Sequence, residues 1–100
     1  MQYLRQATIY KAFAHPTRLQ LLDALNRGER GVSYLQQRLR ITKTNLSQHL
    51  TLLKSAGLVT CRREGRLVYC SLAMPQVSRS LASVRDILKV QVLRNRRSAI

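Results

Sequence analysis

The spacing of apolar residues predicts five helices and one β-hairpin. Apolar side chains recur at every third or fourth residue, as on one face of a helix, over about residues 3–14, 16–26, 43–55 and 75–96. A shorter helix carrying Leu35 and Leu39 is expected before the third of these segments. Residues at about 58–63 and 66–72 predict two strands joined by a tight turn. The pattern therefore indicates a mainly α-helical chain with a small β-hairpin.

Residues that favour helix ends and turns divide these segments. The residue before a proline avoids the helical conformation, so His15-Pro16 separates the first two helices. Gly28 is expected to end the second helix, and Ser33 and Thr42 are expected to cap the third and fourth. Glu64-Gly65 is expected to form the two-residue tip of the hairpin, because glycine permits the positive φ of such a turn.

The composition indicates one domain and a polyanionic partner. The 100 residues suit a single domain over 1–100, and 18 Lys and Arg against 4 Asp and Glu give a formal charge of +14. Double-stranded DNA is the partner that this charge favours. A membrane partner is not expected, because the arginines are spread along the chain and no apolar run approaches about 20 residues. The N-terminus lacks an apolar signal core, so a cytoplasmic protein with reduced cysteines is expected.

The helix expected at about 43–55 has a polar face suited to DNA. Leu46, Leu50 and Leu53 fall within one sector of a helical projection, and the opposite face carries hydroxyls and amides without a carboxylate. Lys43 and Lys54 lie near the two ends of the helix. Amides can pair with base edges and hydroxyls with phosphates. The candidate DNA contacts are Lys43, Thr44, Asn45, Ser47, Gln48, Thr51 and Lys54. The alternative is an ordinary solvated face, although such faces usually mix Glu with Lys.

His49 falls beside the apolar sector of the same helix. Two interpretations stand for it: a half-buried imidazole hydrogen-bonded to the backbone, and a contact with a DNA phosphate.

Three arginines surround the expected hairpin tip. Arg62, Arg63 and Arg66 lie on a two-stranded ribbon that follows the polar helix directly. A ribbon beside a helix in the major groove reaches the flanking backbone or minor groove, where arginine is favoured. The alternative is a charged edge that prevents aggregation between sheets. We expect these arginines to contact DNA, together with the polar helix, as a winged helix-turn-helix.

The two cysteines lie on opposite strands of the same hairpin. With Glu64-Gly65 as the loop, Cys61 faces Val68 and Cys70 is its diagonal neighbour, at about 7–8 Å between Cα atoms. That separation is at the limit for a disulfide, and a register shift of two residues would make the cysteines direct partners. Three interpretations stand: two small buried hydrophobes, a thiol redox switch, and a pair that binds a soft metal ion.

Three segments of the chain resemble the ArsR/SmtB family of bacterial winged-helix repressors. The segments are AHPTRLQLLDAL (14–25), SQHLTLLKSAGLV (47–59) and RREGRLVYCSL (62–72), and the similarity runs from about Ala12 to Leu72. The resemblance implies a winged helix-turn-helix of about five helices plus a two-stranded wing, dimerising through terminal helices at 1–14 and 75–96. By position, it matches Lys43, Thr44, Ser47, Gln48 and His49 to the family's DNA-reading helix, and Arg62, Arg63 and Arg66 to its wing.

The metal-binding motifs of that family are missing at the matching positions. Residues 31–41, GVSYLQQRLRI, contain no Cys, His, Asp or Glu where a Cys-x-Cys box would lie. The last helix offers only Asp86 and no histidine, where other members bind zinc through histidine and acidic residues. Neither site can be carried over, so no metal site and no cofactor is expected.

The expected function is a sequence-specific transcriptional repressor. The resemblance implies a homodimer that binds an operator, blocks transcription and is released when an inducer binds. We expect the operator to be an inverted repeat, and the two cysteines make thiol oxidation one candidate for the release step. An enzyme is not expected, because the four carboxylates are scattered and neither histidine has an evident catalytic partner. The alternative is a DNA-coating or nucleoid-type protein that binds without sequence preference and has no inducer.

Overall fold

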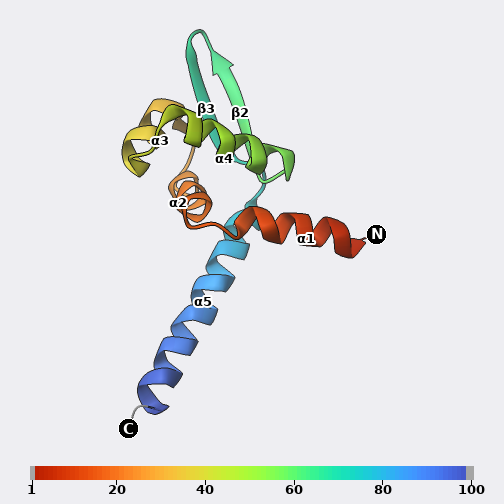
Figure 1. The fold of residues 1–100 in the computed structure, drawn as a ribbon, viewed down its shortest axis with the longest axis vertical. Helices are drawn as coiled ribbons and strands as arrows, with labels where there is room; N and C mark the ends of the chain where they lie inside the picture. Colours follow the sequence, from red (N-terminus) through yellow and green to blue (C-terminus); the bar gives the residue numbers. More distant parts are fainter. Residues whose placement is uncertain (1, 99–100) are drawn as a thin grey trace.

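Five helices and a wing form where the apolar spacing predicts them (Figure 1). The computed structural model describes residues 2–98. In chain order the elements are α1 (Gln2–Phe13), α2 (Pro16–Leu25), β1 (Arg30–Gly31), α3 (Val32–Leu39), α4 (Lys43–Ser55), β2 (Val59–Glu64), β3 (Leu67–Leu72) and α5 (Pro75–Ser98). The expected helices at 3–14, 16–26, 43–55 and 75–96 are confirmed to within two residues at each end.

The helix ends follow from local capping, with one correction. Thr42 caps α4 as predicted, since its Oγ1 accepts a hydrogen bond from Asn45 N at 3.1 Å. The prediction that Ser33 caps the third helix is wrong, because α3 begins at Val32 with Gly31 as its N-cap. Gly31 is held in an extended conformation by pairing with Tyr69, so the helix starts as soon as the strand ends.

The sheet contains a third strand in addition to the predicted hairpin. The strand order is β1-β3-β2, and Arg30 and Gly31 of β1 pair antiparallel with Cys70 and Tyr69 of β3. A two-residue strand is too short to show the alternation by which strands are recognised in a sequence. This third strand ties the base of the wing to the start of α3.

The hairpin loop is Gly65-Arg66 rather than the predicted Glu64-Gly65. Glu64 pairs with Leu67, and Gly65 has a φ of +63° while Arg66 has no positive φ. This matches a type II′ turn, which places glycine at the first central position. The strand register therefore differs from the predicted one by two residues. Cys61 lies directly opposite Cys70, and the expectation that it faces Val68 is wrong.

A leucine-rich core holds the central helices and the base of the wing. The predicted inner face of α4 is confirmed, because Leu46, Leu50 and Leu53 are all buried. The other buried residues are Ala12, Leu21, Leu22, Leu25, Leu35, Leu58, Val59, Cys70, Val77 and Leu81. The polar face of α4, which lies opposite these buried leucines, therefore points to solvent.

The two terminal helices project from this core in different directions (Figure 1). Their outer parts expose large apolar side chains, including Tyr3, Tyr10, Val84 and Leu88, each more than half accessible. No helix within residues 2–98 is long and apolar enough to cross a membrane.

Candidate nucleic-acid interface

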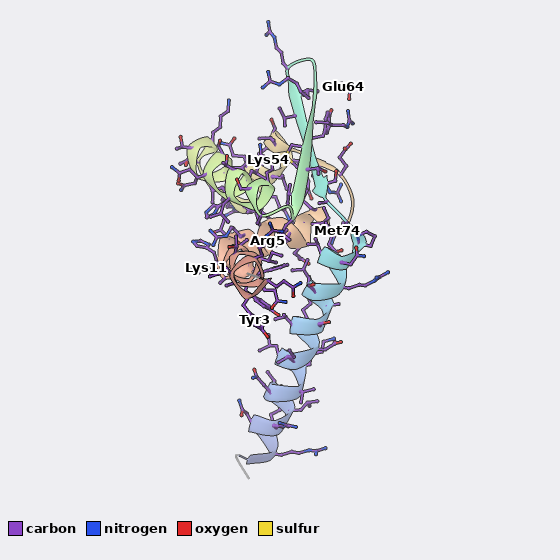
Figure 2. All side chains as sticks on the ribbon, turned by 90° about the vertical axis from the view of Figure 1, so that its right-hand side faces the viewer. Tyr3, Arg5, Lys11, Lys54, Glu64 and Met74 are labelled. Atoms are coloured by element: carbon purple, nitrogen blue, oxygen red, sulfur yellow. A yellow bond between two sulfur atoms is a disulfide. The ribbon has the colours of Figure 1, made fainter. Side chains whose placement is uncertain are left out.

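Helix α4 presents its polar side chains together on one solvent-exposed face. Its buried leucines fix the rotation of the helix about its axis, so the positions between them must face outward. The exposed candidates on this helix are Lys43, Thr44, Asn45, Ser47, Gln48, Thr51 and Lys54. The wing rises beside the helix, with Glu64 near its far end and Lys54 beside its base (Figure 2). Helix and wing can therefore approach one duplex from the same side.

His49 lies at the rim of this face, beside the side chains of Arg18 in α2 and of His15, the N-cap residue of α2. Its Nδ1 is 3.4 Å from Arg18 Nη1, and its ring centroid is 4.7 Å from that of His15. Partial burial lowers the pKa of His49, and the positive fields of His15 and Arg18 lower it further. The surroundings of His49 therefore favour the neutral imidazole over the charged form.

Arg18 was missed as a site residue, and it joins three helices. Its Nε donates to Ala12 O at 2.7 Å and its Nη2 donates to Lys11 O at 3.0 Å, so it caps the C-terminal carbonyls of α1. The same guanidinium reaches His49 on α4. The signal was present in the sequence, because Arg18 lies inside the AHPTR segment that carries the family resemblance.

The three wing arginines have different surroundings, and Arg62 differs from the other two because it forms ion pairs within the protein. Arg62 donates to both carboxylate oxygens of Glu29, at 3.0 and 2.8 Å, and to Glu64 Oε2 at 2.7 Å. Its guanidinium also lies 4.7 Å from the centre of the Tyr69 ring. These two carboxylates raise the pKa of Arg62, and the Arg62 hydrogen bond lowers the pKa of Glu29. Arg62 thus already has partners within the chain.

Arg63 and Arg66 occupy different positions on the wing. Arg63 lies opposite Val68 and, by strand alternation, on the same sheet face as Cys61. Arg66 is the second residue of the hairpin loop. Both side chains are exposed, and neither forms an ion pair within the described residues. They are the wing cations available to an external anion.

Cys61 and Cys70 are joined by a disulfide across the wing strands. Their Cα atoms are 4.1 Å apart, the close spacing of a pair that exchanges no backbone hydrogen bonds. Cys70 is fully buried and Cys61 is half-buried. Residues 2–98 contain no group of three His, Cys, Asp or Glu side chains placed to hold a metal ion.

Comparison with known proteins identifies the family of this chain. The model of the bacterial regulatory protein, arsR family, matches residues 15–60, which include all of α2, α3 and α4. The uncharacterized HTH-type transcriptional regulator Rv0081 of Mycobacterium tuberculosis is 36% identical over 87 residues, covering 86% of this chain and 76% of the relative. This chain belongs to the ArsR family. It is a DNA-binding transcriptional regulator of the ArsR type.

Solved structures of relatives share the fold of this ArsR protein over nearly its whole length. The crystal structure of Rv0081 superposes with a TM-score of 0.85 at 35% identity, covering 95% of each chain. The homodimeric winged helix-turn-helix DNA-binding domain Mb0332 of Mycobacterium bovis superposes with a TM-score of 0.85 at 36% identity, covering 91% of this chain and 84% of that chain.

A further relative was found by sequence. A transcriptional repressor SmtB homolog from Synechocystis is 38% identical over 88 residues, covering 88% of this chain and 67% of the relative.

Proposed function

We propose that this ArsR protein is a dimeric transcriptional repressor that binds an inverted-repeat operator and is released by thiol oxidation. The observation that carries the proposal is the carboxylate-free polar face of α4 beside a wing with two unpaired arginines. On this view α4 enters the major groove, where Gln48 and Asn45 can pair with adenine edges. Arg63 and Arg66 reach the flanking backbone or minor groove and add affinity without sequence preference.

The apolar surface of the terminal helices supports a homodimer. A groove of about 620 Å³ lies between α1 and α5 and is lined mainly by apolar side chains, including Ile9, Tyr10, Val84 and Leu88. Apolar surface on this scale is costly to leave in water and is typical of an interface. A second copy of the chain would cover it, as in the relative whose domain is described as homodimeric. Two copies of α4 related by twofold symmetry would then read a palindromic site.

The wing disulfide supports a redox step. One thiolate of the reduced pair attacks a peroxide, releasing water and becoming a sulfenic acid, and the other thiol displaces a second water as the disulfide forms. The two thiols together lose two electrons and two protons to the peroxide. The disulfide holds the Cα atoms of Cys61 and Cys70 4.1 Å apart. We expect this covalent link to restrict the twist of the two wing strands and so to re-aim Arg63, which lies two residues from Cys61 on the same sheet face.

The test is a binding selection followed by a salt titration. Reduced protein selects from random duplexes, and the enriched site is compared with a scrambled duplex at fixed salt. We expect a palindromic site bound at least about 1,000-fold more tightly than the scrambled one. Equal binding to both would instead identify the DNA-coating function that the charge of +14 also allows. Adding peroxide to the bound complex then tests release.

A further inference from the structure

A second, cationic cavity lies between α2 and α3. It has a volume of about 340 Å³, and its lining includes Gln20, Arg27, Tyr34, Arg38, Leu39 and Arg40. None of the residues predicted to contact DNA lines it. This size is at the lower end for sites that hold a small molecule, about 300–1,000 Å³. The lining of the cavity therefore shares no residue with the candidate interface with nucleic acid.

The charges around this cavity favour an anion. Arg27, Arg38 and Arg40 form no ion pair or hydrogen bond through their side chains within residues 2–98. The one carboxylate in the lining belongs to Asp23, which is paired with Arg85 of α5. A fourth guanidinium, that of Arg30, lies 5.1 Å from the centre of the Tyr34 ring. Several arginines around one pocket whose only carboxylate is already paired are typical of sites for phosphate or carboxylate.

The backbone at Arg40 is a second, independent sign of a site. Arg40 has a φ of +55° and is the only non-glycine residue with a positive φ in the described chain. It is the C-cap of α3, a position where glycine is the usual residue because a Cβ is disfavoured there. Unfavourable backbone conformations of this kind concentrate where a side chain is needed for binding. Here the side chain in question lines the cavity.

We propose that this cavity binds a small organic anion with two negatively charged groups, either phosphate or carboxylate. The arginines would hold the charged groups through paired N–H donors. The ring of Tyr34 and the side chains of Ala24 and Leu39 offer apolar contact to the remainder of the ligand. The ligand would bridge α2 to α3, the first helix of the helix-turn-helix.

The test is calorimetric titration of the full-length protein without DNA. Pyrophosphate and ADP probe a phosphate ligand, and succinate and citrate probe a carboxylate ligand. We expect one of these pairs to bind at one molecule per chain. Arg38→Gln and Arg40→Gly should each lower that affinity at least tenfold, and Arg40→Gly should fold normally because glycine favours this φ. Arg79→Gln removes the same charge from an exposed position on α5 and should leave the affinity unchanged.

Two outcomes would overturn this proposal. One is that no probe binds, and the other is that all three variants lose affinity equally, which would mean general attraction to a basic protein. Because the titration contains no DNA, its failure leaves the proposed repressor function untouched.

Discussion

Arg62 of the wing donates two hydrogen bonds, of 2.8 and 3.0 Å, to the carboxylate of Glu29, the residue just before β1. The two residues are 33 positions apart in the chain. The strand order is β1-β3-β2, so β2 and β1 are the two edge strands. The ion pair therefore links one edge strand, β2, to the residue just before the other edge strand, β1. An arginine that the sequence offers as a DNA contact thus has a partner in the protein itself. We infer that it orients the wing while Arg63 and Arg66 remain available for DNA.

Glu29→Gln should loosen the wing without unfolding the protein. The variant loses the charged partner of Arg62, so backbone amides of β2 should exchange with solvent faster and operator affinity should fall several-fold. Global stability should change little, because both side chains are largely exposed. Asp86→Asn is the control, since it changes the net charge equally at a position on α5. If both variants bind the operator alike, the Arg62–Glu29 pair does not orient the wing.

The same ion pair predicts that the wing becomes less stable at acidic pH. The hydrogen bond from Arg62 lowers the folded-state pKa of Glu29 below its ordinary 4.5, so the folded protein releases this proton more readily than the unfolded chain. The stabilising contribution is complete above about pH 5 and is lost as the pH falls through the folded pKa. The protection factors of the wing amides, which correct for the intrinsic pH dependence of exchange, should fall in the wild type as the pH falls and should already be low in Glu29→Gln.

His49 predicts a second pH dependence, at higher pH. Its folded pKa is lowered while that of the unfolded chain is about 6.5, so the unfolded state binds more protons between the two values. The free energy of unfolding should therefore decrease as the pH falls below about 6.5. Urea unfolding from about pH 8 to pH 5 measures this, and His49→Asn should flatten the decrease. An equal slope in both proteins would contradict a lowered folded-state pKa of His49.

Gln48 and Arg66 should differ in what they contribute to DNA binding. Gln48→Ala should reduce operator affinity by roughly 1–3 kcal/mol and leave random DNA nearly unaffected, as expected when a base contact is lost. Arg66→Ala should weaken both duplexes similarly and make the salt dependence less steep, as expected for a phosphate contact. Fluorescence anisotropy at several salt concentrations measures both. Similar behaviour of the two variants would refute the division of roles between helix and wing.

Removing the thiols should remove the response to oxidants. The double variant Cys61→Ser/Cys70→Ser should bind the operator like the reduced wild type and stay bound when peroxide is added. The wild type should be released by peroxide and restored by dithiothreitol. Wild-type binding that ignores peroxide, although mass spectrometry shows the disulfide, would mean that the two cysteines serve only packing.

Leu88 should be important for the dimer. It is 59% exposed in the single chain and lines the groove between α1 and α5. Leu88→Lys places a charge in that apolar surface, so the dimer dissociation constant should rise at least tenfold, or about 1.4 kcal/mol. Sedimentation equilibrium measures this, with Asp86→Asn as a control of equal charge change. Unchanged dimerisation in Leu88→Lys would locate the interface elsewhere.

The sequence by itself determined the helices and the face of α4 that is exposed. Leucines at helical spacing leave one arrangement that buries them all, so Leu46, Leu50 and Leu53 define the polar face without knowledge of any other element. Thr42 and Pro16 mark helix starts through contacts made within one turn. Both kinds of signal are local, which is why they could be read from the chain.

Only the tertiary structure decided the wing register and the partners of its arginines. Moving the loop from Glu64-Gly65 to Gly65-Arg66 shifts the pairing by two residues, which preserves the alternation of faces, so the apolar pattern cannot distinguish the two registers. The turn geometry that sets the choice depends on the φ of Gly65. The contacts of Glu29 with Arg62 and of Arg18 with His49 join residues distant in sequence, and so does the lining of the cavity between α2 and α3. These residues come close together only when the core packs. No spacing along the chain records such contacts.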